Sequence, residues 1–201
     1  MADYNKIIDH VLKFEGGFAQ IKGDVGGRTI FGIAENFWPQ YWRNGAPSKE
    51  TAKNIFYKNE FWDKLNLDQM KSQLIANEIF DSAINIGHSS PVKWLQIALN
   101  ILIFAERDQR NAHLDMSDII NIKKLKMSKD EFKLILSVDG DLGPNTLTHT
   151  NYYTEKSKTN EVALYSAIDS LQSVKYLFES QPNVVKGHLA QRTQQLELFS
   201  E

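Results

Sequence analysis

The chain has 201 residues, of which 42% are hydrophobic and 24% charged, values that are typical of a folded globular protein and exclude general disorder. Its formal net charge at pH 7 is −2, so no basic excess favours nucleic acid or an anionic membrane surface as a partner. Cysteine is absent, which excludes cysteine-ligated zinc sites, cysteine nucleophiles and disulfide scaffolds.

The first predicted element is an amphipathic helix that ends at Gly16-Gly17. Its apolar face has helical spacing and consists of Ile7, Ile8, Val11 and Leu12. The segment 18–33 carries glycines among short apolar pieces, and this composition predicts turns with a small β-hairpin.

Three further helices are predicted before the middle of the chain. Pro47-Ser48 opens the second helix. Its apolar face is predicted to contain Ala52, Ile55, Phe56 and Trp62. The third helix spans residues 74–86 and stops at Gly87. The fourth begins at Ser90-Pro91, and its apolar run 95–103 predicts a central, buried helix.

The remainder of the chain is more polar at first and then helical again. A capping box, Ser128-x-x-Glu131, precedes a predicted helix over about 130–136. A compact loop follows at 139–144, and two last helices are predicted over about 161–179 and 184–199. The pattern predicts a mainly α fold with one short Gly-rich turn or β-hairpin segment after the first helix.

Few sequence patterns point to metal or cofactor chemistry. The five histidines show no metal-ligand spacing, and nucleophile-elbow, phosphate-loop and dinucleotide motifs are missing. The Asp139 loop lacks the spacing of a calcium-binding loop, and a helix-capping turn is the simpler interpretation. We therefore expect no metal and no cofactor.

Glu15 is the strongest candidate for a catalytic group. It lies at the carboxyl end of the first helix, where the helix dipole disfavours a negative charge. Desolvation by neighbouring Phe14 and Phe18 would add to this effect. Both effects would raise the pKa of Glu15, which suits a general acid. The alternative is an exposed glutamate before a glycine cap.

Asp24 and Thr29 follow Glu15 within the same Gly-rich segment. An acid, a second carboxylate and a hydroxyl near one cleft are suited to glycoside hydrolysis, in which the second group orients or activates water. The alternatives are a turn-forming role for Asp24 and an ordinary strand position for Thr29.

Five motifs occur in an order that resembles one family. They are Glu15-Gly-Gly-Phe18 with Asp24-Val-Gly-Gly-Arg-Thr29-Ile-Phe-Gly-Ile33, Tyr57-Lys-Asn-Glu-Phe-Trp62, Phe80-Asp81-Ser-Ala-Ile-Asn85-Ile-Gly87, Trp94-Leu95-Gln96 and Asp139-Gly140-Asp-Leu-Gly143-Pro144-Asn-Thr146-Leu147. The sequence resembles the glycoside hydrolase family 108 lysozymes, which are phage and bacterial N-acetylmuramidases. Val25 and Ile86 depart from this pattern, where the family usually has Pro and Ser. Roughly thirty extra residues also precede the Asp139 motif.

The resemblance implies a lysozyme-like helical fold and cleavage of the β-1,4 bond between N-acetylmuramic acid and N-acetylglucosamine. It implies that Glu15 is the catalytic glutamate. The order Glu, Asp, Thr is also similar to the triad of phage-type lysozymes, which extends catalytic roles to Asp24 and Thr29. The runner-up function is a non-catalytic peptidoglycan-binding or interaction protein on the same fold.

Four further residues are candidates for binding the glycan. Tyr57 and Trp62 are suited to stacking on sugar rings, but core packing is at least as consistent with their helix face. Asp81 and Asn85 lie four residues apart and share a helical face. They are either cleft contacts or a structural hydrogen-bonded pair.

The sequence also leads to expectations about the domains of the protein, its partners and its location. We expect a catalytic lysozyme-like half over 1–90 and a helical peptidoglycan-binding-like half over 91–201, packed as one globular unit. The insertion at about 104–137 is a candidate surface for a protein partner beside the glycan strands. Because residues 1–15 lack a signal-peptide pattern and no membrane span is present, we expect synthesis in the cytoplasm and action on the cell wall after release or non-classical export.

Overall fold

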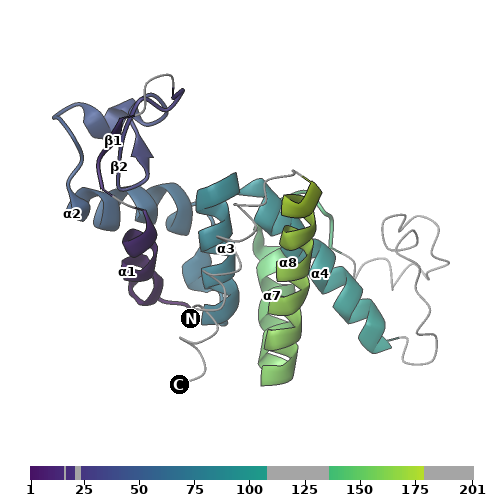
Figure 1. Cartoon of the computed structure of the whole chain (residues 1–201). Helices are drawn as coiled ribbons and strands as arrows, with labels where there is room; N and C mark the ends of the chain where they lie inside the picture. The colour runs from purple at the N-terminus through teal and green to yellow at the C-terminus, as the bar shows by residue number, and fades with distance from the viewer. Residues whose placement is uncertain (16, 21–23, 108–135, 179–201) are drawn as a thin grey trace. The chain divides into compact units, whose positions relative to one another are not determined.

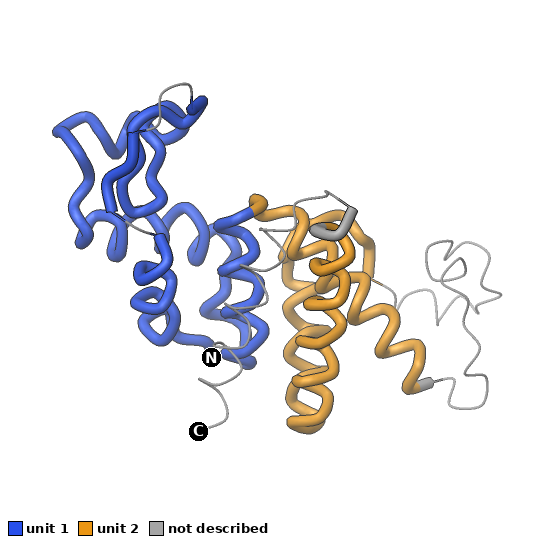
Figure 2. The backbone as a smooth tube through the Cα atoms, viewed as in Figure 1, with its two compact units in different colours: residues 1–85 blue, residues 86–201 orange. Residues whose placement is uncertain are grey.

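The computed structural model describes residues 1–15, 17–20, 24–107 and 136–178 (Figure 1). The chain divides into two compact units, Met1–Asn85 and Ile86–Glu201 (Figure 2). The described parts are mainly helical with one small sheet, so the predicted fold class is confirmed. None of the described helices combines the length and the apolar character that crossing a membrane requires.

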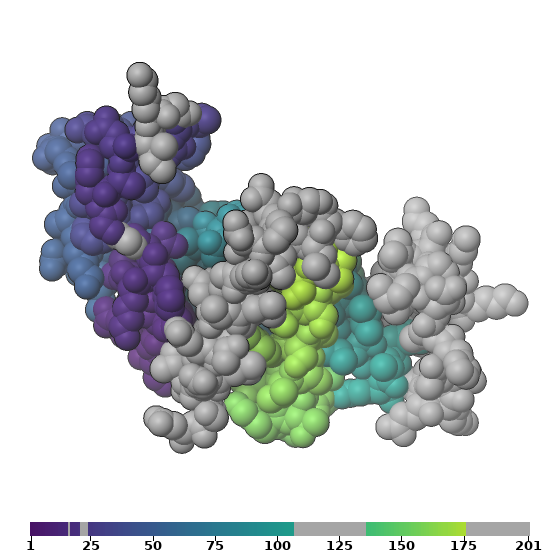
Figure 3. All heavy atoms as spheres, viewed as in Figure 1, coloured from purple at the N-terminus to yellow at the C-terminus, as the bar shows by residue number. Residues whose placement is uncertain are grey.

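Helix α1 of the first unit spans Asn5–Phe14 and buries the four predicted apolar residues. Glu15 is its C-cap, and the Glu15 N–H donates to the Val11 carbonyl at 3.1 Å. The helix therefore ends where the sequence predicts. In the space-filling view, α1 and the strand region that follows it form part of the surface (Figure 3).

The Gly-rich segment forms a three-stranded antiparallel sheet in the order β1 (Ala19–Gln20), β2 (Arg28–Ile30), β3 (Ile33–Ala34). Ile30 pairs with Ile33, which leaves Phe31-Gly32 as a two-residue hairpin loop. Both loop residues have positive φ, +49° and +73°. This is the backbone of a type I′ turn, whose twist matches that of the flanking strands.

The second predicted helix is wound in an unusual way. Ser48 Oγ accepts from the Thr51 N–H at 3.0 Å and opens α2 (Lys49–Thr51), which continues into two π-helical segments, η2 (Ala52–Phe56) and η3 (Lys58–Asp63). Because hydrogen bonds in a π-helix join residues five apart, side chains at a spacing of five share a face. Buried Phe56 and Tyr57 are thus followed by buried Phe61 and Trp62.

The same winding corrects one prediction. Ile55 was expected on the apolar face, but its side chain is 46% exposed. The expectation used the spacing of an α-helix, whereas the five-residue spacing turns Ile55 to the solvent side. Two short 3₁₀ segments, η1 (Pro39–Trp42) and η4 (Leu67–Gln69), lie before and after this run.

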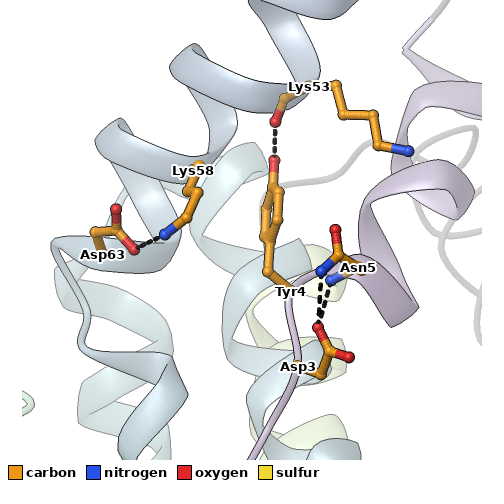
Figure 4. A network of polar contacts seen from close by, with 6 residues as sticks. All are labelled: Asp3, Tyr4, Asn5, Lys53, Lys58 and Asp63. Atoms are coloured by element: carbon orange, nitrogen blue, oxygen red, sulfur yellow. Dashed lines mark hydrogen bonds and ion pairs between the residues drawn. The ribbon is translucent and has the colours of Figure 1, made fainter.

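Tyr4 anchors α1 to the π-helical run (Figure 4). Its hydroxyl donates to the Lys53 carbonyl at 2.5 Å, and its ring makes edge contacts with Trp62 and Phe80 at centroid distances of 5.5 and 5.8 Å. Asp3 Oδ1 accepts from the Asn5 N–H at 2.9 Å beside it. Aromatic packing of this kind forms part of the core of the first unit, beside aliphatic residues such as Ile8 and Ile75.

Helix α3 spans Gln73–Ile86 and ends immediately before Gly87, as predicted. The second unit contains α4 (Ser89–Arg107), α7 (Pro144–Lys156) and α8 (Lys158–Phe178), and α4 packs against both of the others. Within α4, Leu95, Ala98 and Leu99 are buried. The other apolar residues of the predicted run are only half-buried, so the expectation of burial on all sides was wrong for Ile97, Ile101, Leu102 and Ile103.

Helix α7 was not predicted as a separate element. Its buried face consists of Thr146, Leu147, Thr150, Tyr153 and Thr154. Because most of these side chains carry a hydroxyl group, hydropathy shows no helical period there. The threonines satisfy their hydroxyl groups locally, since Thr150 and Thr154 each donate to the carbonyl four residues earlier.

The Asp139 loop is a structural turn that is hydrogen-bonded to α4. Buried Gln96 of α4 donates to Asp139 Oδ1 at 2.7 Å and accepts from the Gly140 N–H at 3.0 Å. The capping box at 128–131, its helix, the helix over 184–199 and most of the insertion lie outside the described residues.

Candidate active site

Glu15 stands at the junction of α1 and the sheet. Its side chain is half-buried, and its carboxylate lies beside Gly32 in the β2–β3 turn. A Cβ atom placed on residue 32 would be 2.5 Å from Glu15 Oε2, closer than non-bonded atoms approach. The turn therefore leaves room for the carboxylate only because residue 32 has no side chain.

Tyr57 lies behind the same turn. Its side chain is 1% exposed, and its hydroxyl group donates to the Phe31 carbonyl at 2.9 Å. The Tyr57 hydroxyl oxygen also occupies the space that a Cβ of residue 32 would need. The carboxylate of Glu15 thus lies beside two groups, the Tyr57 side chain from the π-helical run and the Gly32 backbone from the hairpin turn.

The surroundings of Glu15 favour its protonated form. Burial is the main cause that raises the pKa of Glu15, and the negative charge of Asp81 on α3 raises it further. The predicted direction is confirmed. Burial likewise raises the pKa of Tyr57, and the nearby Glu15 charge adds to this effect.

The predicted source of the desolvation was wrong. Phe14 and Phe18 are 45% and 57% exposed, so they shield Glu15 little. Phe14 turns instead to the His10 ring, with a centroid distance of 5.0 Å. Each phenylalanine is close to Glu15 in sequence, but the carboxylate points toward Gly32 and Tyr57.

Asp24 and Thr29 occupy the positions that their structural alternatives describe. Asp24 is exposed, and its Oδ1 accepts from the Gly26 N–H at 3.1 Å within the turn before β2. Thr29 is the central residue of β2, opposite Ala19 and Ala34. Among the described residues, no hydrogen bond or ion pair joins either side chain to Glu15.

The four candidate glycan-binding residues differ in their exposure. Trp62 is 1% exposed and packs between Tyr4 and Phe80, and Tyr57 is equally buried. Asp81 is half-buried near Glu15, while Asn85 is exposed and donates to the Asp81 backbone carbonyl at 2.9 Å. Only Asp81 and Asn85 retain accessible surface for a ligand.

Sequence reasoning missed two participants in this site. Gly32 and the Phe31 carbonyl position Tyr57 and Glu15, yet neither was singled out. The sequence signal was weak, because two-residue hairpin loops favour Asn-Gly, Asp-Gly or Gly-Gly, and only the glycine of Phe31-Gly32 fits this preference. In the part of the chain that the structure describes, no group of three or more His, Cys, Asp or Glu is arranged to hold a metal ion.

Comparison with known proteins agrees with the resemblance. Residues 8–87 match the family model of glycosyl hydrolase 108, a stretch that includes Glu15, Tyr57 and Asp81. This match supports a glycoside hydrolase and implies a glycan substrate. No curated protein sequence matches the chain significantly.

A solved structure shares the fold. The structure of Brucella abortus SagA aligns with 98% of this chain and 91% of its own, at 17% sequence identity and a TM-score of 0.56. At this identity the likeness concerns the fold alone.

Proposed function

We propose that the protein is a peptidoglycan hydrolase, an N-acetylmuramidase that cleaves the β-1,4 bond between N-acetylmuramic acid and N-acetylglucosamine. The observation that carries the proposal is Glu15, a half-buried carboxyl group with a raised pKa, within the residues that match a glycosyl hydrolase family. A general acid must hold its proton near the working pH, and this environment favours that state.

The proposed chemistry begins with proton transfer. Glu15 donates its proton to the glycosidic oxygen as the bond to the leaving sugar breaks, and positive charge develops on the other ring. Asp24 and Thr29 are proposed to orient or activate the water that completes hydrolysis. Their support is weaker, because both side chains also have structural explanations in the turn and the strand.

The proposed glycan contacts are Asp81 and Asn85. Both have accessible surface, and Asp81 is electrostatically coupled to Glu15. We assign Trp62 and Tyr57 to packing and positioning instead, since a ring that is 1% exposed has no face to offer a sugar.

The test compares Glu15→Gln with Glu50→Gln. Glu50 is an exposed residue in the first turn of α2, so its variant controls for the loss of one carboxylate. We expect Glu15→Gln to slow the clearing of a cell-wall suspension by about 10²–10⁴-fold, the usual contribution of a general acid, and Glu50→Gln to leave it unchanged. Mass analysis of the products should show N-acetylmuramic acid at the new reducing end.

Two outcomes would contradict the proposal. Clearing by Glu15→Gln at the parent rate would remove Glu15 from the chemistry. Binding of walls by the parent protein without any release of muropeptides would favour the non-catalytic alternative. Asp24→Asn and Thr29→Ala are expected to lower the rate less than Glu15→Gln, and a parent rate in either variant would return that residue to a structural role.

A further inference from the structure

The Tyr57 hydroxyl group is held in one orientation. Its proton is donated to the Phe31 carbonyl at 2.9 Å, and the side chain is almost completely buried. A phenol has a single O–H to donate, so the oxygen of Tyr57 has only acceptor capacity left. Any other polar group beside that oxygen must therefore supply the hydrogen.

That acceptor lies next to Glu15. The Tyr57 oxygen and Glu15 Oε2 both fall within 2.5 Å of the point where a Cβ of residue 32 would stand, so they are no farther apart than twice that distance. An ionised carboxylate has no hydrogen to donate, whereas a protonated carboxyl group has one. Protonated Glu15 can therefore donate a hydrogen bond to the Tyr57 oxygen, whereas ionised Glu15 cannot.

We infer that Tyr57 is a positioning residue whose oxygen accepts a hydrogen bond from Glu15 only when Glu15 is protonated. This hydrogen bond thereby stabilises the protonated form of the proposed acid. A hydrogen bond that forms with the neutral state alone disfavours ionisation. The inference rests on the proposed function for its catalytic meaning, but the coupling itself is a property of the folded protein.

Two other groups affect the pKa values of this pair, and their effects can be separated. The negative charge of Asp81 on α3 raises the pKa of Glu15, and Tyr4 at the start of α1 raises the pKa of Tyr57. Asp81 favours the protonated acid by repulsion and does not depend on the Tyr57 hydroxyl. Tyr4 provides a matched control, because it is a buried tyrosine of the same core that also donates to a backbone carbonyl.

The experiment compares Tyr57→Phe with Tyr4→Phe. Each variant keeps its ring and leaves one carbonyl without its donor. We expect Tyr57→Phe to move the alkaline limb of the pH profile of kcat/KM for peptidoglycan cleavage to lower pH. The rate should fall about fivefold on the alkaline side and little on the acidic side, the effect of one ordinary hydrogen bond. Tyr4→Phe should leave the limb where the parent has it.

A direct titration separates this inference from the proposed function. The carboxyl carbon of Glu15, assigned by comparison with Glu15→Gln, reports its protonation by NMR whether or not the protein hydrolyses peptidoglycan. A lower Glu15 pKa in Tyr57→Phe, unmatched in Tyr4→Phe, supports the inference even if the hydrolytic function fails. An unchanged or higher Glu15 pKa in Tyr57→Phe overturns it.

A second variant covers the case in which Tyr57→Phe does not fold. Asp81→Asn removes the charge repulsion and leaves the Tyr57 oxygen in place. We expect the Glu15 pKa of this variant to stay above that of an ordinary glutamate, because burial, its main cause, and the Tyr57 oxygen both remain. A fall to the ordinary value would overturn the inference.

Discussion

At the scale of the residue, Glu15 links the site to the stability of the fold. Its pKa is raised in the folded protein, chiefly by burial and then by Asp81. The unfolded chain therefore ionises this group first as pH rises, and folding loses stability between the unfolded and the folded pKa. The full contribution of Glu15 is present only below the ordinary glutamate pKa of about 4.3.

Glu15→Gln should accordingly be more stable than the parent at neutral pH. We expect an increase in Tm on the order of 2–4 °C, because the variant buries a neutral amide in place of a carboxylate. The difference should shrink as pH falls toward 4 and vanish below it. Thermal unfolding of both proteins across this pH range tests the sign, and a less stable variant at neutral pH would contradict it.

Gly32 is the second residue with a sharp expectation. Gly32→Ala places a methyl group against the Tyr57 hydroxyl oxygen and Glu15 Oε2, at a backbone φ of +73°. We expect a loss of about 2–4 kcal/mol in the free energy of unfolding, from backbone strain and overpacking together, and a loss of activity.

Gly45→Ala is the matched control for Gly32→Ala. Gly45 also has a positive φ, +98°, but nothing lies within 4 Å of its Cβ position. It should cost about 1 kcal/mol from strain alone and leave the activity intact. Equal losses in urea unfolding of the two variants would show that the crowding at Gly32 has no energetic consequence.

At the scale of the element, the π-helical run is stabilised by its aromatic face. Trp62 packs against Tyr4 and Phe80, and its side chain is only 1% exposed. Trp62→Ala should lower the free energy of unfolding by about 3–5 kcal/mol, because it opens a large cavity in the core. Ile55→Ala, on the exposed side of the same run, should change it by less than about 0.5 kcal/mol.

Chemical denaturation of the two variants measures this contrast. The comparison also tests the winding of the run, since an α-helical winding would place Ile55 on the buried face with Ala52 and Phe56. A loss for Ile55→Ala as large as that for Trp62→Ala would contradict the five-residue spacing.

At the scale of the whole molecule, the described residues of the candidate site belong to the first unit, Met1–Asn85. Glu15, Gly32, Tyr57 and Asp81 all precede the insertion. In the second unit, α4 continues to Arg107, and Asn100 of α4 exchanges two hydrogen bonds with the backbone of Leu136. The proposed catalytic groups and the inserted segment thus belong to different units.

Replacing residues 108–135 with a flexible Gly/Ser linker should therefore leave cleavage of soluble muropeptides within about threefold of the parent, since loop length has little effect on closure entropy. Both hydrogen bonds between Asn100 and Leu136 are retained in this design. A shortened protein that folds by circular dichroism but fails to cleave soluble fragments would show that the insertion contributes to the active site.

Several features follow from local sequence alone. Helical periodicity predicts α1 and its end at Glu15, and glycines after α1 predict the hairpin, because these signals depend on neighbouring residues. The ordered motifs led to the glycosyl hydrolase resemblance, which the match over 8–87 supports. A raised Glu15 pKa was also expected, but the causes that raise it are burial and the charge of Asp81, which the local sequence does not identify.

The remaining features depend on contacts between residues far apart in the chain. The π-helical winding that buries Tyr57, the placement of its hydroxyl on the Phe31 carbonyl and the approach of Asp81 involve residues separated by about 25 positions or more. Periodicity carries no information about such distances. Helix α7 was missed because its threonine-rich buried face has no hydropathy signal. Phe14 is adjacent to Glu15 in sequence, but it packs on His10 and does not desolvate the carboxylate. Local chemistry selects the acid, whereas the tertiary fold decides which groups desolvate it.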